Sequence, residues 1–133
     1  MTKRRALLDT SAILDPPADL AALADQVCIS TVSLAELAEG LHPGDHVEAA
    51  RRADAYALIT ATFEAIPFSA QAARLYGALE ATARDQGRSP LRRFDLLIAA
   101  VAASERLPVI SSNPRALRGL HPSVRVIEAS ERA

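Results

Sequence analysis

The chain has 133 residues, enough for one domain with its own core and too few for two. Its 15 Lys and Arg nearly balance 16 Asp and Glu, which excludes a strongly basic nucleic-acid binder without excluding nucleic acid as a ligand. One cysteine cannot form an internal disulfide, and no apolar run approaches the roughly 18 residues of a membrane span. These features predict a cytoplasmic protein with a single domain over residues 1–133.

Five short apolar runs separated by helical patterns are predicted to be strands. They cover residues 6–8, 27–29, 65–68, 109–111 and 124–127. Helices are expected at about 18–25, 32–40, 46–63, 70–86 and 94–105, and the 28 alanines of the chain favour them because alanine has the best helix propensity. Strands that alternate with helices predict an α/β fold, with a parallel sheet and helices packed on its faces.

Polar residues at the ends of these segments support the predicted helices. Thr31, Asp45 and Ser69 are each expected to cap the helix that follows, and Gly40 and Gly87 to end the second and fourth helices. The helix at 94–105 is apolar nearly all round, so it should run through the centre of the domain.

Two acidic residues follow predicted strands. Asp9 comes directly after the first strand, at the carboxyl end where open α/β sheets bind ligands, although capping the turn at residues 11–14 explains it equally well. Glu36 lies in the first turns of the second helix and borders its apolar stripe, and the alternative is a solvated residue. Glu39, one turn further along, is expected to be solvated.

Asp95 stands at the start of the most apolar helix. The helix dipole alone explains an acidic residue there, but a helix buried on all sides carries its first turn into the interior, so this carboxylate is expected to face a cleft. If Asp9, Glu36 and Asp95 converge, their repulsion raises a pKa or requires a cation between them. Mg²⁺ meets that requirement, and a water held by the metal can attack a phosphodiester.

Four motifs in this order resemble those of the PIN-domain ribonucleases, and more narrowly of VapC-type toxins of bacterial type II toxin–antitoxin pairs. They are Leu7-Leu8-Asp9-Thr10-Ser11, Ser33-Leu34-Ala35-Glu36-Leu37, the run from Arg93 to Ala100, and Ser111-Ser112-Asn113. The resemblance covers nearly the whole chain. It implies a three-layer α/β/α fold with a five-stranded parallel sheet, a homodimer, and an acidic edge that binds Mg²⁺ or Mn²⁺.

The resemblance also implies roles for individual residues. Asp9 and Asp95 become the principal metal ligands and catalytic residues, with Glu36 as a third acid. Ser11 would orient Asp9 by a hydrogen bond. Asn113 matches a position that is a fourth acid in some relatives, and neither Asn113 nor Ala116 is acidic here, so a second metal ion would be held weakly or only with substrate bound.

Other side chains are interpreted more simply. His42 and His46 are expected to be loop residues because Pro43 and Gly44 separate them, and Cys28 is expected to be a buried, inert thiol. Arginines gather just before Asp95, where they can contact RNA or acidic residues of an antitoxin, or be merely solvated. These arginines are Arg84, Arg88, Arg92 and Arg93.

The leading hypothesis is a Mg²⁺-dependent endoribonuclease that is restrained by a cognate antitoxin. A catalytically weakened PIN-like module that only binds RNA or antitoxin is the alternative, motivated by the missing fourth acid. A DNA endonuclease of the same fold is a further one. The chain lacks both glycine-rich motifs that hold nucleotide phosphates, G-x-x-x-x-G-K-[ST] and a G-x-G-x-x-G after the first strand, which argues against a nucleotide-binding fold of either type.

Overall fold

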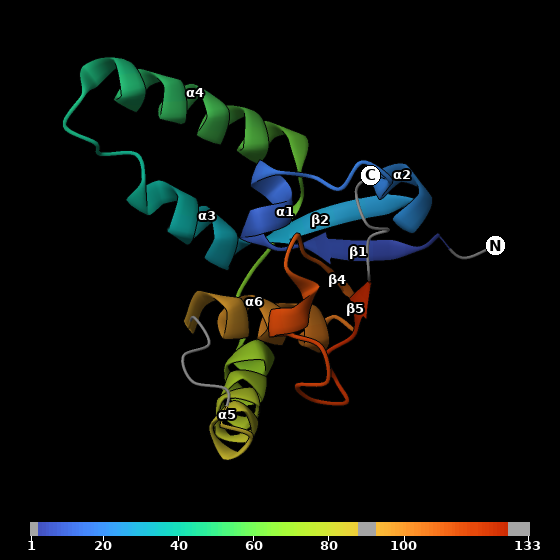
Figure 1. The fold of residues 1–133 in the computed structure, drawn as a ribbon. Helices are drawn as coiled ribbons and strands as arrows, with labels where there is room; N and C mark the ends of the chain where they lie inside the picture. Colours follow the sequence, from blue (N-terminus) through green and yellow to red (C-terminus); the bar gives the residue numbers. More distant parts are fainter. Residues whose placement is uncertain (1–2, 88–92, 128–133) are drawn as a thin grey trace.

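Five strands run parallel in one sheet of order β3-β2-β1-β4-β5 (Figure 1). The computed structural model describes residues 3–87 and 93–127. The strands are β1 (Arg5–Leu8), β2 (Gln26–Ser30), β3 (Ala65–Ile66), β4 (Val109–Ile110) and β5 (Val126–Ile127). Each strand falls on a predicted apolar run, but the last three are shorter than predicted. The sheet therefore confirms the five predicted strands and their parallel arrangement.

Helices cover both faces of the sheet because successive side chains of a strand point to opposite sides. Leu7 of β1 packs in one core cluster with side chains of α5 (Ala70–Asp85) and α6 (Arg93–Ser104). Its neighbour Leu8 packs in a second cluster with side chains of α1 (Thr10–Leu14) and α2 (Leu20–Leu23). Figure 1 shows these helices on opposite sides of the sheet, which confirms the three-layer α/β/α prediction.

Helix α6 is the buried helix that the sequence predicts. Leu96 and all the residues from Ile98 to Ala102 are buried. Cys28 of β2 is also buried, and this burial raises the pKa of its thiol, as expected for an unreactive cysteine. No helix of the described residues is long and apolar enough to cross a membrane.

Helices α3 (Thr31–Glu39) and α4 (His46–Thr62) form an arm at one side of the sheet (Figure 1). Helix α4 has no fully buried side chain. It contacts the core through Ile59, which is partly buried. The loop assignment of His46 is wrong, because Asp45 caps α4 by accepting hydrogen bonds from two backbone N–H groups and the helix begins at His46. Both His42 and His46 are exposed.

The cap of α3 differs from the prediction by one residue. Ser30, and not Thr31, is the N-cap, since its hydroxyl accepts a 3.0 Å hydrogen bond from the backbone N–H of Val32. Thr31 is already helical, and its hydroxyl accepts a hydrogen bond from the N–H of Phe68 instead. The predicted cap at Ser69 is confirmed, as its hydroxyl accepts from the N–H of Ala72.

Candidate active site at the carboxyl edge of the sheet

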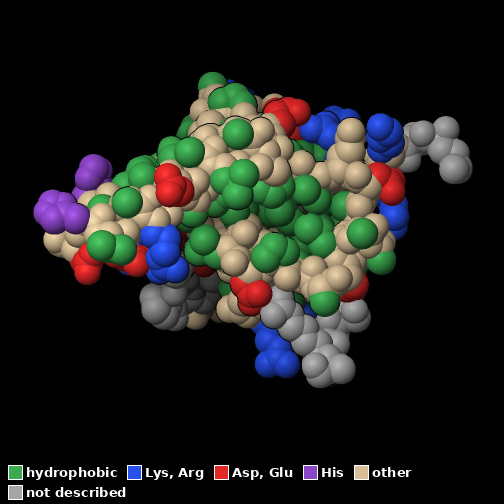
Figure 2. Space-filling view, turned by 90° about the horizontal axis from the view of Figure 1, so that it is seen from above, with side chains coloured by type: hydrophobic (Ala, Val, Ile, Leu, Met, Phe, Trp, Pro, Cys, Tyr) green, Lys and Arg blue, Asp and Glu red, His purple; other side chains and the backbone are tan. Residues whose placement is uncertain are grey.

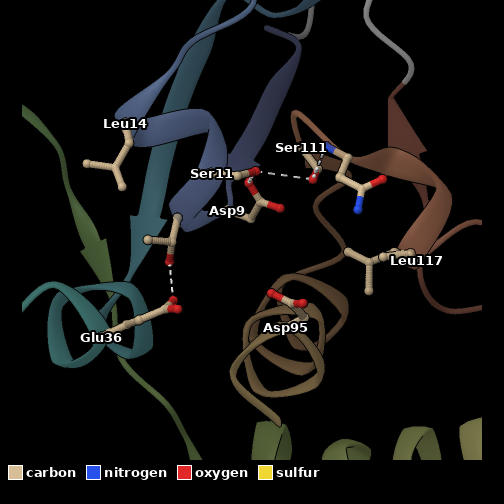
Figure 3. Close-up of a pocket in the computed structure, with 10 residues that line it drawn as sticks. Asp9, Ser11, Leu14, Glu36, Asp95, Ser111 and Leu117 are labelled. Carbon is tan, nitrogen blue, oxygen red and sulfur yellow. Dashed lines mark hydrogen bonds between the residues drawn. The ribbon is translucent and has the colours of Figure 1, made fainter. Parts of the chain in front are cut away.

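Strands β1 and β4 end side by side and open a pocket of about 390 Å³. Asp9 follows β1 directly, Ser111 follows β4 directly, and the N–H of Asp9 donates a 3.0 Å hydrogen bond to the carbonyl of Ile110. The pocket is lined by Asp9, Thr10, Ser11, Leu14, Glu36, Asp95, Ser111, Asn113, Ala116 and Leu117 (Figure 3). The structure thus brings all three predicted acids, with Ser11 and Asn113, to one pocket.

Asp9 is buried, with 7% of its surface exposed. Its Oδ1 accepts a 2.6 Å hydrogen bond from the hydroxyl of Ser11 and a 2.9 Å hydrogen bond from the backbone N–H of Ala12. Asp9 is therefore the N-cap of α1, which was the structural explanation offered from the sequence. Because both hydrogen bonds involve Oδ1, they fix the carboxylate and leave Oδ2 to face the pocket.

Ser11 also ties the ends of the two strands together. Its Oγ accepts a 3.1 Å hydrogen bond from the N–H of Ser112 and lies 3.4 Å from Oγ of Ser111. The hydroxyl of Ser111 in turn accepts a 3.0 Å hydrogen bond from the N–H of Asn113. The sequence placed Ser111 in a motif but assigned it no role, although a polar residue directly after a buried strand, as at Asp9, is the signal that could have indicated one.

Glu36 is half-buried and turned towards α1. The hydroxyl of Thr10 donates a 2.6 Å hydrogen bond to Oε1 of Glu36, and its Oγ1 lies 3.0 Å from Oγ of Ser33 (Figure 3). Glu36 is thus not the solvated residue of the alternative interpretation, whereas Glu39 is exposed as predicted. Thr10 belongs to the first motif, but its contact with Glu36 was not predicted because Glu36 lies on another helix.

Asp95 lies half-buried in the first turn of α6, and Figure 3 shows its carboxylate at the end of that helix, directed towards Asp9. In the described part of the chain, no three acidic, His or Cys side chains are grouped closely enough to hold a metal ion by themselves. The pair of Asp9 and Asp95 still fits Mg²⁺, because this ion keeps several waters and is commonly bound by only one or two carboxylates.

The arginines predicted to contact RNA or antitoxin do not line this pocket where they are described. Arg84, in the last turn of α5, is exposed and lies 3.5 Å from Glu80. Arg93 begins α6 and is exposed. Arg88 and Arg92 lie outside the described residues. Their predicted contacts therefore remain predictions.

An α/β/α sandwich with carboxylates at the carboxyl edge of its parallel sheet defines a class of protein, and comparison with known families gives that class a name. The model of the PIN domain matches residues 6–119, so the chain belongs to the PIN-domain family. The chain is also 34% identical over 116 residues to ribonuclease VapC5 of Mycobacterium tuberculosis, covering 84% of this chain and 85% of that protein.

Solved structures of toxin–antitoxin proteins share the fold. The VapBC-5 structure from Mycobacterium tuberculosis superposes with a TM-score of 0.79 at 35% identity, covering 92% of this chain and 97% of that one. VapBC2 from Rickettsia felis, bound to a DNA fragment from its promoter, superposes with a TM-score of 0.76 at 25% identity over the same shares. The chain is thus similar to VapC-type proteins in both sequence and structure.

Proposed function

We propose that this protein is a Mg²⁺- or Mn²⁺-dependent endoribonuclease that hydrolyses RNA phosphodiester bonds. The observation that carries the proposal is the arrangement of Asp9, Glu36 and Asp95, which come from three different elements and line one pocket. Likeness to a protein named as a ribonuclease supports RNA as the substrate. The active unit would be the single domain of residues 1–133.

Asp9 and Asp95 would hold the metal ion, with Glu36 as a third acid. A bound Mg²⁺ or Mn²⁺ supplies activation of water and neutralisation of phosphate charge. The chain positions its carboxylates beforehand, because Ser11 and the N–H of Ala12 fix Asp9 and the hydroxyl of Thr10 fixes Glu36. Catalytic groups held in this way need little reorganisation during the reaction.

The uncharged residues that line the pocket would bind and shield the substrate. Asn113 lines the pocket and carries an amide that can donate hydrogen bonds to phosphate oxygens. Leu14 and Leu117 give the pocket apolar walls, and apolar surroundings strengthen electrostatic interactions within the site.

A cleavage assay on purified protein tests this function. A structured RNA should be cut in the presence of Mn²⁺ or Mg²⁺ and remain intact in EDTA. Asp9→Asn and Asp95→Asn should abolish cutting, while a double-stranded DNA substrate should remain uncut, which separates RNA from DNA cleavage. Full activity in EDTA would exclude the metal-dependent mechanism.

The toxin role is the second part of the proposal: a cognate antitoxin would bind the protein and restrain it in the cytoplasm. A groove of about 310 Å³ between α1, α3 and α4 supports such a partner. Its apolar wall includes Leu37, Tyr56 and Ile59, and it shares Leu14 and Glu36 with the acidic pocket. Figure 2 looks onto the face that carries α4 and shows hydrophobic side chains gathered across its middle.

Expression in cells tests the toxin role. Induction should arrest growth, Asp95→Asn should relieve the arrest, and co-expression of the antitoxin should do the same. The protein would also form a homodimer, as its family resemblance implies, and light scattering of the purified protein tests this. Mapping the cut RNA ends after induction would identify the target RNA.

One observation favours a second candidate, a weakened module that binds RNA or antitoxin without cleavage. Asn113 brings no charge to the pocket, and the described residues do not form a group of three metal-binding side chains. Such a module would bind RNA equally well in EDTA and with Mn²⁺, and would neither cut RNA nor arrest growth. The same cleavage and growth assays therefore separate the two candidates.

A further inference from the structure

A second cleft, of about 590 Å³, lies at the amino edge of the sheet, where β1, β4 and β5 begin. Its lining residues are Lys3, Arg4, Arg5, Leu23, Arg106, Leu107, Pro108, Arg125, Val126 and Ile127. Strand β1 separates this basic cleft from Asp9 by roughly 13 Å, at about 3.3 Å per residue. The basic cleft and the acidic pocket share no lining residue, so they are distinct sites.

The lining of the basic cleft contains five basic side chains and no acidic one. Two of them face exposed carboxylates: Arg4 lies 3.3 Å from Asp25, whose pKa its hydrogen bonds lower, and Arg5 lies 3.9 Å from Glu64. The other three, Lys3, Arg106 and Arg125, make no ion pair within residues 3–87 and 93–127. The cleft therefore carries excess positive charge in a chain whose net charge is −1.

Arg106 occupies an unusual backbone position at the rim of the cleft. Its φ is 57°, and among the described residues it is the non-glycine residue with a positive φ. Arg106 follows the end of α6 and caps it: its N–H donates to the carbonyl of Ala103, and the N–H of Leu107 donates to that of Ala102. These two hydrogen bonds form a Schellman motif at the C-terminus of the helix. Glycine is the usual residue at the position of Arg106 in this motif, because an L side chain is strained there. Its side chain is exposed, and its carbonyl accepts a 2.6 Å hydrogen bond from Nη2 of Arg125, so the two arginines lie together at the rim of the cleft.

The basic groups form a row across three neighbouring strands. Lys3, Arg4 and Arg5 precede or begin β1, Arg106 precedes β4, and Arg125 precedes β5. Adjacent strands lie about 4.8 Å apart, so the row suits a linear polyanion better than a single compact anion. The apolar walls, Leu23 and Val126 among them, lower the local dielectric constant and so strengthen the positive potential.

We propose that this basic cleft binds the phosphate backbone of RNA as a second contact region, remote from the acidic pocket. Guanidinium groups bind phosphate oxygens in a bidentate geometry. The lining offers no aromatic side chain on which bases could stack, so binding is independent of base sequence. The proposal rests on the proposed function only in its choice of RNA as the polyanion.

Fluorescence polarisation with a labelled oligouridylate of about 20 nucleotides tests the proposal in EDTA, where metal-dependent cleavage is absent. The double variant Arg106→Gly/Arg125→Gln should bind about tenfold more weakly than the wild type, and the slope of log affinity against log salt should fall by about 0.7 for each lost phosphate contact. Arg106→Gly relieves backbone strain, so its melting temperature should not fall. The exposed control variant Arg74→Gln should bind like the wild type.

Two results would overturn the proposal. One is an unchanged affinity and salt slope in the double variant. The other is polyglutamate that binds as tightly as the RNA and depends equally on Arg106 and Arg125, which would define a site for acidic peptides. Arg106→Lys should retain RNA binding, because it keeps the charge. Cleavage is measured separately with Mn²⁺, so a protein that binds RNA through this cleft but never cuts it supports the cleft and contradicts the nuclease function.

Discussion

Ser11 and Asp9 are joined by a 2.6 Å hydrogen bond in which the hydroxyl of Ser11 donates to Oδ1 of Asp9. The same hydroxyl oxygen accepts from the N–H of Ser112, 101 residues further along the chain. The side chain of Ser11 thus fixes the carboxylate of Asp9 relative to the end of β4. In the proposed nuclease, Ser11 is a positioning residue for the principal metal ligand.

Removing this hydroxyl should weaken metal binding more than it weakens folding. In Ser11→Ala, the Mn²⁺ concentration for half-maximal cleavage should rise about 10- to 100-fold, because partners that orient metal ligands contribute that much to affinity. Saturating Mn²⁺ should restore most of the rate. Ser112→Ala is the matched control, since only the backbone N–H of this exposed residue contacts Ser11. An unchanged Mn²⁺ midpoint in Ser11→Ala would contradict the positioning role.

The hydrogen bond from Thr10 to Glu36 leads to a second prediction. Thr10→Val keeps the shape of the side chain but removes the donor, so the cleavage rate should fall about tenfold, which corresponds to a loss of about 1.4 kcal/mol of transition-state stabilisation. Thr10→Ser keeps the hydroxyl and should retain activity. If Thr10 acts through Glu36, adding Thr10→Val to Glu36→Gln should cause no further loss. Additive losses would show that Thr10 acts independently of Glu36.

Glu48 of α4 provides a prediction about pH. Hydrogen bonds from the guanidinium groups of Arg51 and Arg52 lower the pKa of this carboxyl to about 2, from an ordinary value near 4.5. Because the pKa of Glu48 is lower in the folded state, its ionised carboxylate stabilises the folded protein above pH 4.5. This contribution to stability is lost as the pH falls towards 2. Glu48 is partly exposed and both arginines are more exposed than it is, so salt should weaken the effect.

An NMR titration of the carboxyl carbon measures this pKa directly. The wild type should titrate near pH 2, and the double variant Arg51→Gln/Arg52→Gln should titrate closer to 4.5. A wild-type midpoint near 4.5 at low salt would mean that the ion pairs of α4 are not populated in solution.

The sequence predicts elements whose local pattern matches their burial. Most of strand β1 and the middle of helix α6 are buried, so both are nearly continuous apolar runs that can be recognised without knowledge of their neighbours. The cap of α3 was misplaced because Ser30 and Thr31 are adjacent and both can cap. The choice depends on how far β2 extends, and β2 includes Ser30.

Contacts between distant segments could not be predicted in the same way. The bond from Thr10 to Glu36 spans 26 residues, and it forms only because α1 and α3 pack side by side. Likewise, Arg5, Arg106 and Arg125 are far apart in sequence and meet only through the order of β1, β4 and β5. The order of the motifs along the chain indicated the three acidic residues of the pocket. Which other side chains lie beside them depends on how the strands pair in the sheet.

Asn113 provides the prediction that separates a weakened nuclease from a binding module. Its backbone N–H is held by Ser111, and its uncharged side chain lines the pocket with Asp9 and Asp95. Asn113→Asp adds a negative charge there, which strengthens attraction for a divalent cation. The Mn²⁺ concentration for half-maximal cleavage should fall about tenfold, equivalent to about 1.4 kcal/mol of binding free energy.

Two further variants make this result interpretable. Ala116→Asp places a charge at the other candidate position on the same wall and should also lower the Mn²⁺ requirement, whereas Asn113→Ala adds no charge and should not. Isothermal titration with Mn²⁺ measures the affinity independently of cleavage. If Asn113→Asp binds Mn²⁺ more tightly yet still cuts no RNA, the pocket holds metal without supporting hydrolysis, and the binding-module candidate replaces the nuclease.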